Sequence, residues 1–241
     1  MKRFALIGKT LGHSYSQQWF SDLFARLGLT DHSYRLHEMM SLEGLRQLVD
    51  NEHIDGFNVT IPYKQAIIAL LDDISPEANA IGAVNCVCVK DGRLTGHNTD
   101  APAFKSCVRN NDFGVILGTG GAARAVSYAL QQLGIGHCHV SRTPELHANA
   151  IGYAEAKSLA LNTKHLALIN ATPVGMYPHV DESPWPWPEL LCRFGHVYDL
   201  IYNPSPTLLM RQAAAQGCTV SDGTDMLHRQ AELSWQLWQR L

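Results

Sequence analysis

The sequence predicts an α/β protein with two domains, in each of which strands alternate with helices. Short apolar runs typical of strands alternate along the 241 residues with longer runs whose apolar residues recur at helical spacing. Strands that are separated by helices predict parallel sheets with helices on their faces. We expect residues 1–100 and 224–241 to form a first domain and residues 101–223 to form a second.

The expected elements of the first domain follow the chain in order. Strands are expected at 3–8, 32–39 and 54–61, and helices at 16–29, 41–51 and 63–74. Gly28 is placed to close the first helix, and Ser41 is a plausible N-cap of the second. Asp91-Gly92 is a strong two-residue turn signal and predicts a hairpin over residues 82–99. A helix over residues 101–111 then leads into the second domain.

The second domain opens with residues 113–143, which read as strand, glycine turn, helix and strand. Further alternation is expected over 165–172, 196–202, 207–217 and 218–223. Residues 183–188, "SPWPWP", read as a rigid loop whose tryptophans cover apolar surface. The final helix, 225–241, carries apolar residues at helical spacing, including Trp235 and Trp238, and is expected to pack on the first domain.

Composition and charge argue against several classes of function. The net charge is −3 with no run of Lys or Arg, which disfavours nucleic acid or an anionic membrane as a partner. No apolar run approaches the roughly 20 residues that span a bilayer, and the first apolar stretch is too short for a signal peptide. The six scattered cysteines suit free thiols in a reducing compartment, so we expect a cytoplasmic protein.

His137-Cys138-His139 is the arrangement that most resembles a metal site. Strand alternation places both histidines on one face and the cysteine on the other, and no further ligand is spaced to join them. We therefore expect structural residues here and no bound metal.

The glycine turn "GTGGAAR" predicts a Rossmann-type dinucleotide-binding domain. It fits G-x-G-x-x-A with Gly118, Gly120 and Ala123. In such a turn the first glycine permits the tight bend, the second lets the backbone approach a pyrophosphate, and the small third residue lets helix and strand pack closely. The amides at the start of the helix then point at the phosphates.

The end of the next strand indicates which dinucleotide is bound. An NAD site usually carries Asp or Glu there, to accept a hydrogen bond from the ribose 2′-hydroxyl. This chain has Ser141, Arg142 and Thr143 instead. Because Arg142 can stack on adenine and pair with a 2′-phosphate, the sequence favours NADP over NAD.

Polar side chains follow three of the expected strands in the first domain. They are Ser14 and Ser16 in "GHSYS", Thr60 and Lys64 in "NVTIPYK", and Asn98, Thr99 and Asp100 in "GHNTD". In open α/β sheets ligands lie outside the carboxyl ends of the strands, so these groups should converge. A lysine beside an aspartate can deliver the proton that a ketone needs when it is reduced by hydride transfer.

These residues carry a family resemblance. The segments "HSYS", "NVTIPYK", "GAVN", "NTD", "GTGGAAR", "SRT", "NATPVGM", "YDLIYNP" and "DGTDMLHRQA" occur in this order. With this spacing the sequence closely resembles the shikimate dehydrogenases along nearly its whole length. The resemblance implies reversible, NADPH-dependent reduction of 3-dehydroshikimate to shikimate, a step of chorismate and aromatic amino acid biosynthesis. It also implies a substrate-binding first domain and an NADP-binding second domain.

The resemblance assigns roles to individual positions. Lys64 would be the acid–base group and Asp100 its partner. Substrate would be bound by Ser14, Ser16, Thr60, Asn85, Tyr202 and Gln230. NADP would be bound by Gly118, Thr119, Gly120, Gly121, Ala122, Ser141, Arg142, Thr143, Thr172, Met176 and Gly223, with Asn170 nearby.

The chain departs from the family pattern at a few positions. Gln17 stands where the family often has proline, and Ser141 where it often has asparagine. Leu146 occupies the place of a second arginine, which should weaken NADP discrimination. Asp225 stands where many members have glycine, and it could tune the site or face solvent.

Other functions remain open from the sequence. A quinate/shikimate dehydrogenase paralogue would use NAD or accept quinate. The absence of an acidic residue after the second strand argues against NAD, but quinate would need only small changes in the pocket. A methylenetetrahydrofolate dehydrogenase shares the two-domain plan but would not need paired serines for a small carboxylate. A non-catalytic sensor would be expected to have lost Lys64 or Asp100. The chain could be a monomer or a homodimer.

Overall fold

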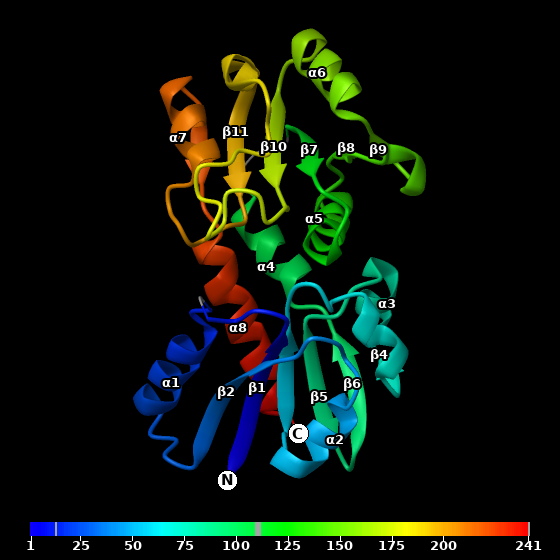
Figure 1. Cartoon of the computed structure of the whole chain (residues 1–241), viewed down its shortest axis with the longest axis vertical. Coiled ribbons are helices and arrows are strands. Elements are labelled where there is room, and N and C mark those ends of the chain that lie inside the picture. The colour runs from blue at the N-terminus through cyan, green and yellow to red at the C-terminus, as the bar shows by residue number, and fades with distance from the viewer. Residues whose placement is uncertain (13, 109–111, 241) are drawn as a thin grey trace. The chain divides into compact units, whose positions relative to one another are not determined.

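The computed structural model describes residues 1–12, 14–108 and 112–240. The chain forms two compact units, one made of residues 1–100 and 228–241 and the other of residues 101–227 (Figure 1). The sequence-based division placed residues 224–227 with the first unit. They form the first turn of α8 (Thr224–Trp238), whose later turns belong to the first unit.

The first unit contains a sheet of six strands with the order β2-β1-β3-β5-β6-β4. The strands are β1 (Lys2–Gly8), β2 (His32–Glu38), β3 (Gly56–Val59), β4 (Asp73–Ile74), β5 (Cys86–Lys90) and β6 (Arg93–His97). The expected hairpin is confirmed as β5 and β6, because Asp91 and Gly92 both adopt the positive φ of a tight turn. The hairpin makes β5 antiparallel to both β3 and β6, so this sheet is mixed.

Helices cover both faces of this sheet because alternate residues of β1 point to opposite sides. Phe4 and Leu6 pack with α1 (Ser16–Arg26) and α8. Ala5 and Ile7 belong to a second core with α2 (Leu45–Glu52), the 3₁₀ helix η1 (Ala66–Leu70) and α3 (Pro76–Ile81). As expected, Gly28 ends the first helical segment with φ of 69°.

The last helix packs on the first unit, as the sequence predicted. Trp238 stacks on Phe4 with ring centroids 4.6 Å apart, and its indole Nε1 donates to the Val87 carbonyl over 3.0 Å. A Cβ on Gly56 would lie 2.4 Å from this indole nitrogen, so the strand needs a glycine where the tryptophan crosses it.

Two local expectations for the first unit are wrong, and one helix was not anticipated. The helix expected over 63–74 is only the 3₁₀ turn η1, because Asp73 and Ile74 pair with β6 as strand β4. Ser41 is not the N-cap of α2; Gly44 is, and the Ser41 hydroxyl accepts from the Glu43 amide instead. Helix α3 was not anticipated, although Ser75 caps it by accepting from the Ala78 amide.

The second unit contains a fully parallel sheet with the order β12-β11-β10-β7-β8-β9. The strands are β7 (Phe113–Leu117), β8 (His137–Val140), β9 (Ala150–Ile151), β10 (Leu166–Asn170), β11 (Phe194–Asp199) and β12 (Thr219–Ser221). Read from the other edge, this is the 3-2-1-4-5-6 order of dinucleotide-binding folds. Ligands of such sheets bind where the strand order reverses, which here lies between β7 and β10.

Helices of the second unit also lie on both sheet faces. They are α4 (Asp100–Cys107), α5 (Gly121–Gln132), α6 (Tyr153–Asn162), α7 (Leu208–Ala215) and the 3₁₀ helices η2 (Pro144–Leu146) and η3 (Pro188–Arg193). Trp185 of the expected rigid loop is fully buried beside α6 and α7. Helix α6 and strand β9 were not anticipated. Residues 109–111 of the helix expected over 101–111 lie outside the described residues, as does residue 241.

No helix in the described part of the chain is both long enough and apolar enough to cross a bilayer.

Candidate functional site

The first unit holds a buried lysine–carboxylate pair. Lys64 Nζ lies 2.7 Å from Asp100 Oδ2, and the two side chains are 16% and 5% exposed. The Val84 amide donates to the Lys64 carbonyl over 2.7 Å, which fixes the backbone where β3 has ended. A pair this enclosed is expensive to desolvate, so its retention calls for further hydrogen bonds or a function.

Asn85 supplies those further hydrogen bonds. Its Nδ2 donates to Asp100 Oδ1 over 2.8 Å and to Thr99 Oγ1 over 2.9 Å, and its Oδ1 accepts from the Thr99 amide. Gln230 Oε1 lies 3.4 Å from the same Nδ2. The structure therefore brings together four of the predicted residues from four separate segments: Lys64, Asn85, Asp100 and Gln230.

A second layer of buried polar groups lies behind Asn85, and sequence reasoning missed it. Asn58 Nδ2 donates to the Asn85 carbonyl and to Ser234 Oγ, while Tyr34 donates its hydroxyl proton to Asn58 Oδ1 over 2.9 Å. Ser234 Oγ is 3.3 Å from Thr99 Oγ1. The signal in the sequence was an asparagine inside the otherwise apolar run "GFNV", where a buried amide must find partners.

The remaining substrate residues predicted in the first unit occupy loop and helix ends. Ser14 precedes α1, and its hydroxyl accepts from the Ser16 amide over 3.3 Å. Ser16 begins α1 and is 8% exposed. Thr60 directly follows β3, and its amide donates to the Ile7 carbonyl. Their contact with substrate stays a prediction.

The glycine turn of the second unit lies at the point where its strand order reverses. Gly118 follows β7 with φ of 106°, and a Cβ there would lie 3.1 Å from Thr172 Cγ2, just past the end of β10. A Cβ on Gly120 would meet no atom within 4 Å, so the space over the turn is open. Gly120 is the N-cap of α5 without a side-chain cap. The first amides of α5 are therefore available to phosphate oxygens, and the turn fits the expected dinucleotide.

The segment after β8, residues 141–143, forms a local turn that exposes an arginine. Ser141 Oγ accepts from the Thr143 amide over 3.1 Å, which closes a local turn. Arg142 between them is exposed and forms no ion pair with any residue that the structure describes. Its guanidinium is free to pair with an incoming anion.

A buried carboxylate ties the ends of β10 and β11 to α7. Asp199 accepts from Asn170 Nδ2 over 2.9 Å, from Thr207 Oγ1 over 2.7 Å and from the Ile201 amide over 3.1 Å. Burial raises the pKa of Asp199 to about 6, and these donors only partly offset it. The network also holds the start of the "NATPVGM" loop, because Asn170 Oδ1 accepts from the amide and the hydroxyl of Thr172.

Three other predicted residues lie in loops of the second unit. Tyr202 follows β11, Met176 is 40% exposed, and Gly223 precedes α8. A Cβ on Gly223 would lie 2.1 Å from the Leu200 carbonyl oxygen, so this position requires glycine for packing alone. Their roles toward ligands stay predictions.

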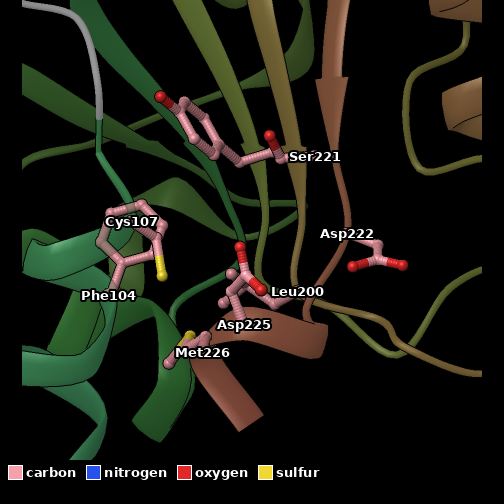
Figure 2. Close-up of a pocket in the computed structure, with 8 residues that line it drawn as sticks. Phe104, Cys107, Leu200, Ser221, Asp222, Asp225 and Met226 are labelled. Atoms are coloured by element: carbon pink, nitrogen blue, oxygen red, sulfur yellow. The ribbon is translucent and has the colours of Figure 1, made fainter. Parts of the chain in front are cut away.

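Asp225, the departure from the family pattern, lines a small cavity of about 30 Å³. Figure 2 shows it at the start of α8 with Phe104, Cys107 and Leu200 around the same cavity. Its carboxylate is exposed, and the cavity is too small for an organic substrate. In the described ranges, no three His, Cys, Asp or Glu side chains are grouped to hold a metal ion.

Fold and site together define a class of protein. A parallel sheet in the 3-2-1-4-5-6 order with an open glycine turn is the fold of nucleotide-dependent dehydrogenases. The separate α/β unit adds an enclosed proton donor of the kind that reduction of a ketone requires. The chain is thus a two-unit α/β protein with the features of a dehydrogenase.

Comparison with known proteins specifies the family. Residues 6–87 match the shikimate dehydrogenase substrate binding domain. The shikimate dehydrogenase (NADP(+)) of Nostoc sp. is 38% identical over 98% of this chain and 90% of its own length.

Solved structures agree with this match. Shikimate dehydrogenase 1 of Peptoclostridium difficile has a TM-score of 0.88 at 35% identity, over 100% of this chain and 92% of its own. Shikimate 5-dehydrogenase of Thermus thermophilus, in complex with NADP(H) and shikimate, has a TM-score of 0.86 at 36% identity, over 100% and 94%. This chain belongs to the shikimate dehydrogenase family.

Proposed function

We propose that this chain catalyses the reversible, NADP-dependent reduction of 3-dehydroshikimate to shikimate, a step toward chorismate and the aromatic amino acids. The observation that carries this proposal is the enclosed Lys64–Asp100 pair with Asn85 on the second carboxylate oxygen. Membership of the family, with relatives that bind NADP(H) and shikimate, supports the substrate and the cofactor.

Lys64 delivers the proton in this reaction. Bound NADPH would supply the hydride that converts the ketone carbon into an alcohol carbon. The oxygen then becomes an alkoxide, and the Lys64 ammonium protonates it. Asp100 holds the ammonium in one position through the 2.7 Å contact, and Asn85 prevents the carboxylate from turning away.

Side chains around the pair would bind the ring acid. Ser14 and Ser16 would donate hydroxyl hydrogens to its carboxylate, while Thr60, Asn85, Tyr202 and Gln230 would bind its hydroxyl groups or carboxylate. The serines lie at the start of α1, where the amides of the first turn also favour an anion. In the second unit, the glycine turn would hold the pyrophosphate, and Ser141, Arg142 and Thr143 the 2′-phosphate.

The proposal is tested by replacing Lys64. We expect Lys64→Ala and Lys64→Gln to lower kcat for NADP reduction by shikimate at least about a hundredfold, the usual effect of losing a general acid–base group. The shikimate KM should change less, because the other binding groups remain. Lys90→Ala, which removes an exposed lysine at the hairpin turn, is the matched control and should leave both constants unchanged.

Two further measurements complete this test. Because removing one partner of a buried pair can destabilise a fold, urea unfolding followed by circular dichroism shows whether each variant is folded. Assays of the unmodified chain with quinate and with NAD distinguish the proposed activity from that of a quinate/shikimate paralogue. Full activity of Lys64→Gln, or a preference for NAD with quinate, would contradict the proposal.

A further inference from the structure

A groove of about 770 Å³ lies beside α5 on one face of the second sheet. The pairing of Gly114 with His137 and of Ile116 with His139 places both histidines on the same face as Gly114. This face packs against α5, because a Cβ on Gly114 would lie 2.6 Å from Leu130. The connection from β8 to β9 contains only the 3₁₀ turn η2 among the described residues.

The groove is lined by positive and potentially positive side chains. They are Arg124 of α5, His137 and His139 of β8, and His147 after η2. No aspartate or glutamate occurs among the described residues that line it. Arg124 is exposed and forms no ion pair within the described ranges. Four such groups without a carboxylate make a groove that is suited to an anion.

Hydrogen bonds connect the histidines to the glycine turn. His139 Nδ1 lies 2.9 Å from the Gly118 carbonyl, to which it donates, and this leaves its Nε2 for another partner. His147 Nε2 lies 3.3 Å from Thr119 Oγ1. Burial lowers the pKa of His139, the hydrogen bond to the Gly118 carbonyl partly opposes this, and the nearby His137, Arg124 and His147 lower the pKa further. Arg124, His137 and His147 are therefore close enough to His139 to act on it electrostatically, and an anion bound among them would favour the charged form of His139.

The position of the groove indicates which anion it receives. Thr119, within the turn expected to hold the pyrophosphate, forms part of its lining. Leu146 and His147 line another side of the groove, and they follow the Ser141–Thr143 segment by a few residues in the chain. The groove thus lies between the glycine turn and residues 146–149, which follow the other predicted cofactor segment in the chain. Leu146 itself is apolar and 72% exposed, so it contributes no charge.

We propose that Arg124 and His147 bind the 2′-phosphate of NADP in this groove and set the preference for NADP over NAD. This inference rests on the proposed function, and it adds these two side chains to the Ser141–Thr143 segment. A phosphate monoester carries about −1.5 to −2 charges and three acceptor oxygens, which matches a guanidinium and imidazoles that lack acidic partners.

Binding of nucleotide fragments tests the proposal directly. Calorimetry without shikimate would compare adenosine 2′,5′-bisphosphate, which carries the 2′-phosphate, with ADP, which lacks it. We expect Arg124→Gln and His147→Asn each to weaken binding of the 2′,5′-bisphosphate about tenfold to a hundredfold, the range for a charge-assisted hydrogen bond. ADP binding should change less than about twofold. The ratio of kcat/KM for NADPH over NADH should fall by a similar factor.

Controls separate this proposal from its alternatives. His165→Asn removes an imidazole that is 87% exposed and outside the groove, and it should alter neither affinity. Its backbone φ of 59° is tolerated by asparagine. Leu146→Arg should strengthen binding of the 2′,5′-bisphosphate and compensate for His147→Asn.

The proposal is overturned if Arg124→Gln and His147→Asn weaken ADP as much as the 2′,5′-bisphosphate, or if they weaken neither. It is also overturned if inorganic phosphate binds the groove as tightly as the 2′,5′-bisphosphate does, since the groove would then be a site for free phosphate. The measurement needs no turnover, so it is independent of the proposed reaction. If the chain lacks shikimate dehydrogenase activity but still binds the 2′,5′-bisphosphate through Arg124, the proposed reaction is refuted and the proposed phosphate site is not.

Discussion

At the scale of single residues, Asn85 has the largest structural role in the site of the first unit. It is 2% exposed and contacts Thr99, Asp100 and Gln230. Lys64 holds one oxygen of Asp100 and Asn85 holds the other. The orientation of the proton donor therefore depends on an amide that does no chemistry itself.

Replacing Asn85 with alanine should affect both stability and turnover. The change leaves Asp100 Oδ1 and the Thr99 amide without their partner in a buried place, which costs about 1–3 kcal/mol for each such group. We expect a lower free energy of unfolding in urea and a fall in kcat of about tenfold or more. Asn162→Ala, on the exposed face of α6, is the control. Unchanged stability and kcat in Asn85→Ala would refute the role assigned to this amide.

At the scale of elements, Asp199 fixes the junction of β10, β11 and α7. Its carboxylate accepts hydrogen bonds from Asn170 at the end of β10 and from Thr207, the N-cap of α7. The loop with Thr172 starts at the same junction. The geometry beside the glycine turn therefore depends on one buried acid whose pKa is raised to about 6 by burial.

The raised pKa predicts a specific dependence of stability on pH. Between the ordinary aspartate pKa of 3.8 and about 6, the folded chain keeps a proton that the unfolded chain has released. The free energy of unfolding should therefore fall as pH rises through this window, and the loss is complete above about pH 6. A difference of about two pKa units corresponds to about 3 kcal/mol.

Asp199→Asn isolates this contribution because an amide does not titrate. Urea unfolding measured from about pH 4 to about pH 7 should show a smaller pH slope in Asp199→Asn than in the unmodified chain. The exposed Asp181→Asn is the control and should keep the original slope. Equal slopes in all three chains would mean that Asp199 titrates alike in the folded and unfolded states.

At the scale of the whole molecule, the two units carry different halves of the predicted chemistry. The acid–base pair lies in the unit of residues 1–100 and 228–241, and the glycine turn in the unit of residues 101–227. Each unit has its own sheet and its own core. A ligand should therefore stabilise the unit that holds its site, by about 2.7 kcal/mol at one hundred times its Kd.

Hydrogen exchange can assign each ligand to its unit. We expect NADP to slow amide exchange at residues 117–124, which include the glycine turn and Arg124, and at residues 141–147, which end at His147 of the proposed phosphate groove. Shikimate should slow exchange at 14–20, 58–64 and 84–100 instead. Inorganic sulfate at equal ionic strength controls for a general salt effect. Protection by NADP that is confined to the segments named for shikimate would refute the assignment of the two sites.

The sequence by itself determined the α/β class, the glycine turn, the hairpin at Asp91-Gly92 and the pairing of Lys64 with Asp100, because each depends on local residue chemistry or on strand ends that share one sheet edge. The sequence did not show that residues 71–74 are not helical, since pairing of Asp73 and Ile74 with β6 outweighs their local preference for a helix. Nor did it reveal the Tyr34–Asn58–Ser234 network or the groove of Arg124, His137, His139 and His147. Both arise from contacts between segments far apart in the chain, and only the folded backbone decides which of these side chains share a buried or enclosed space.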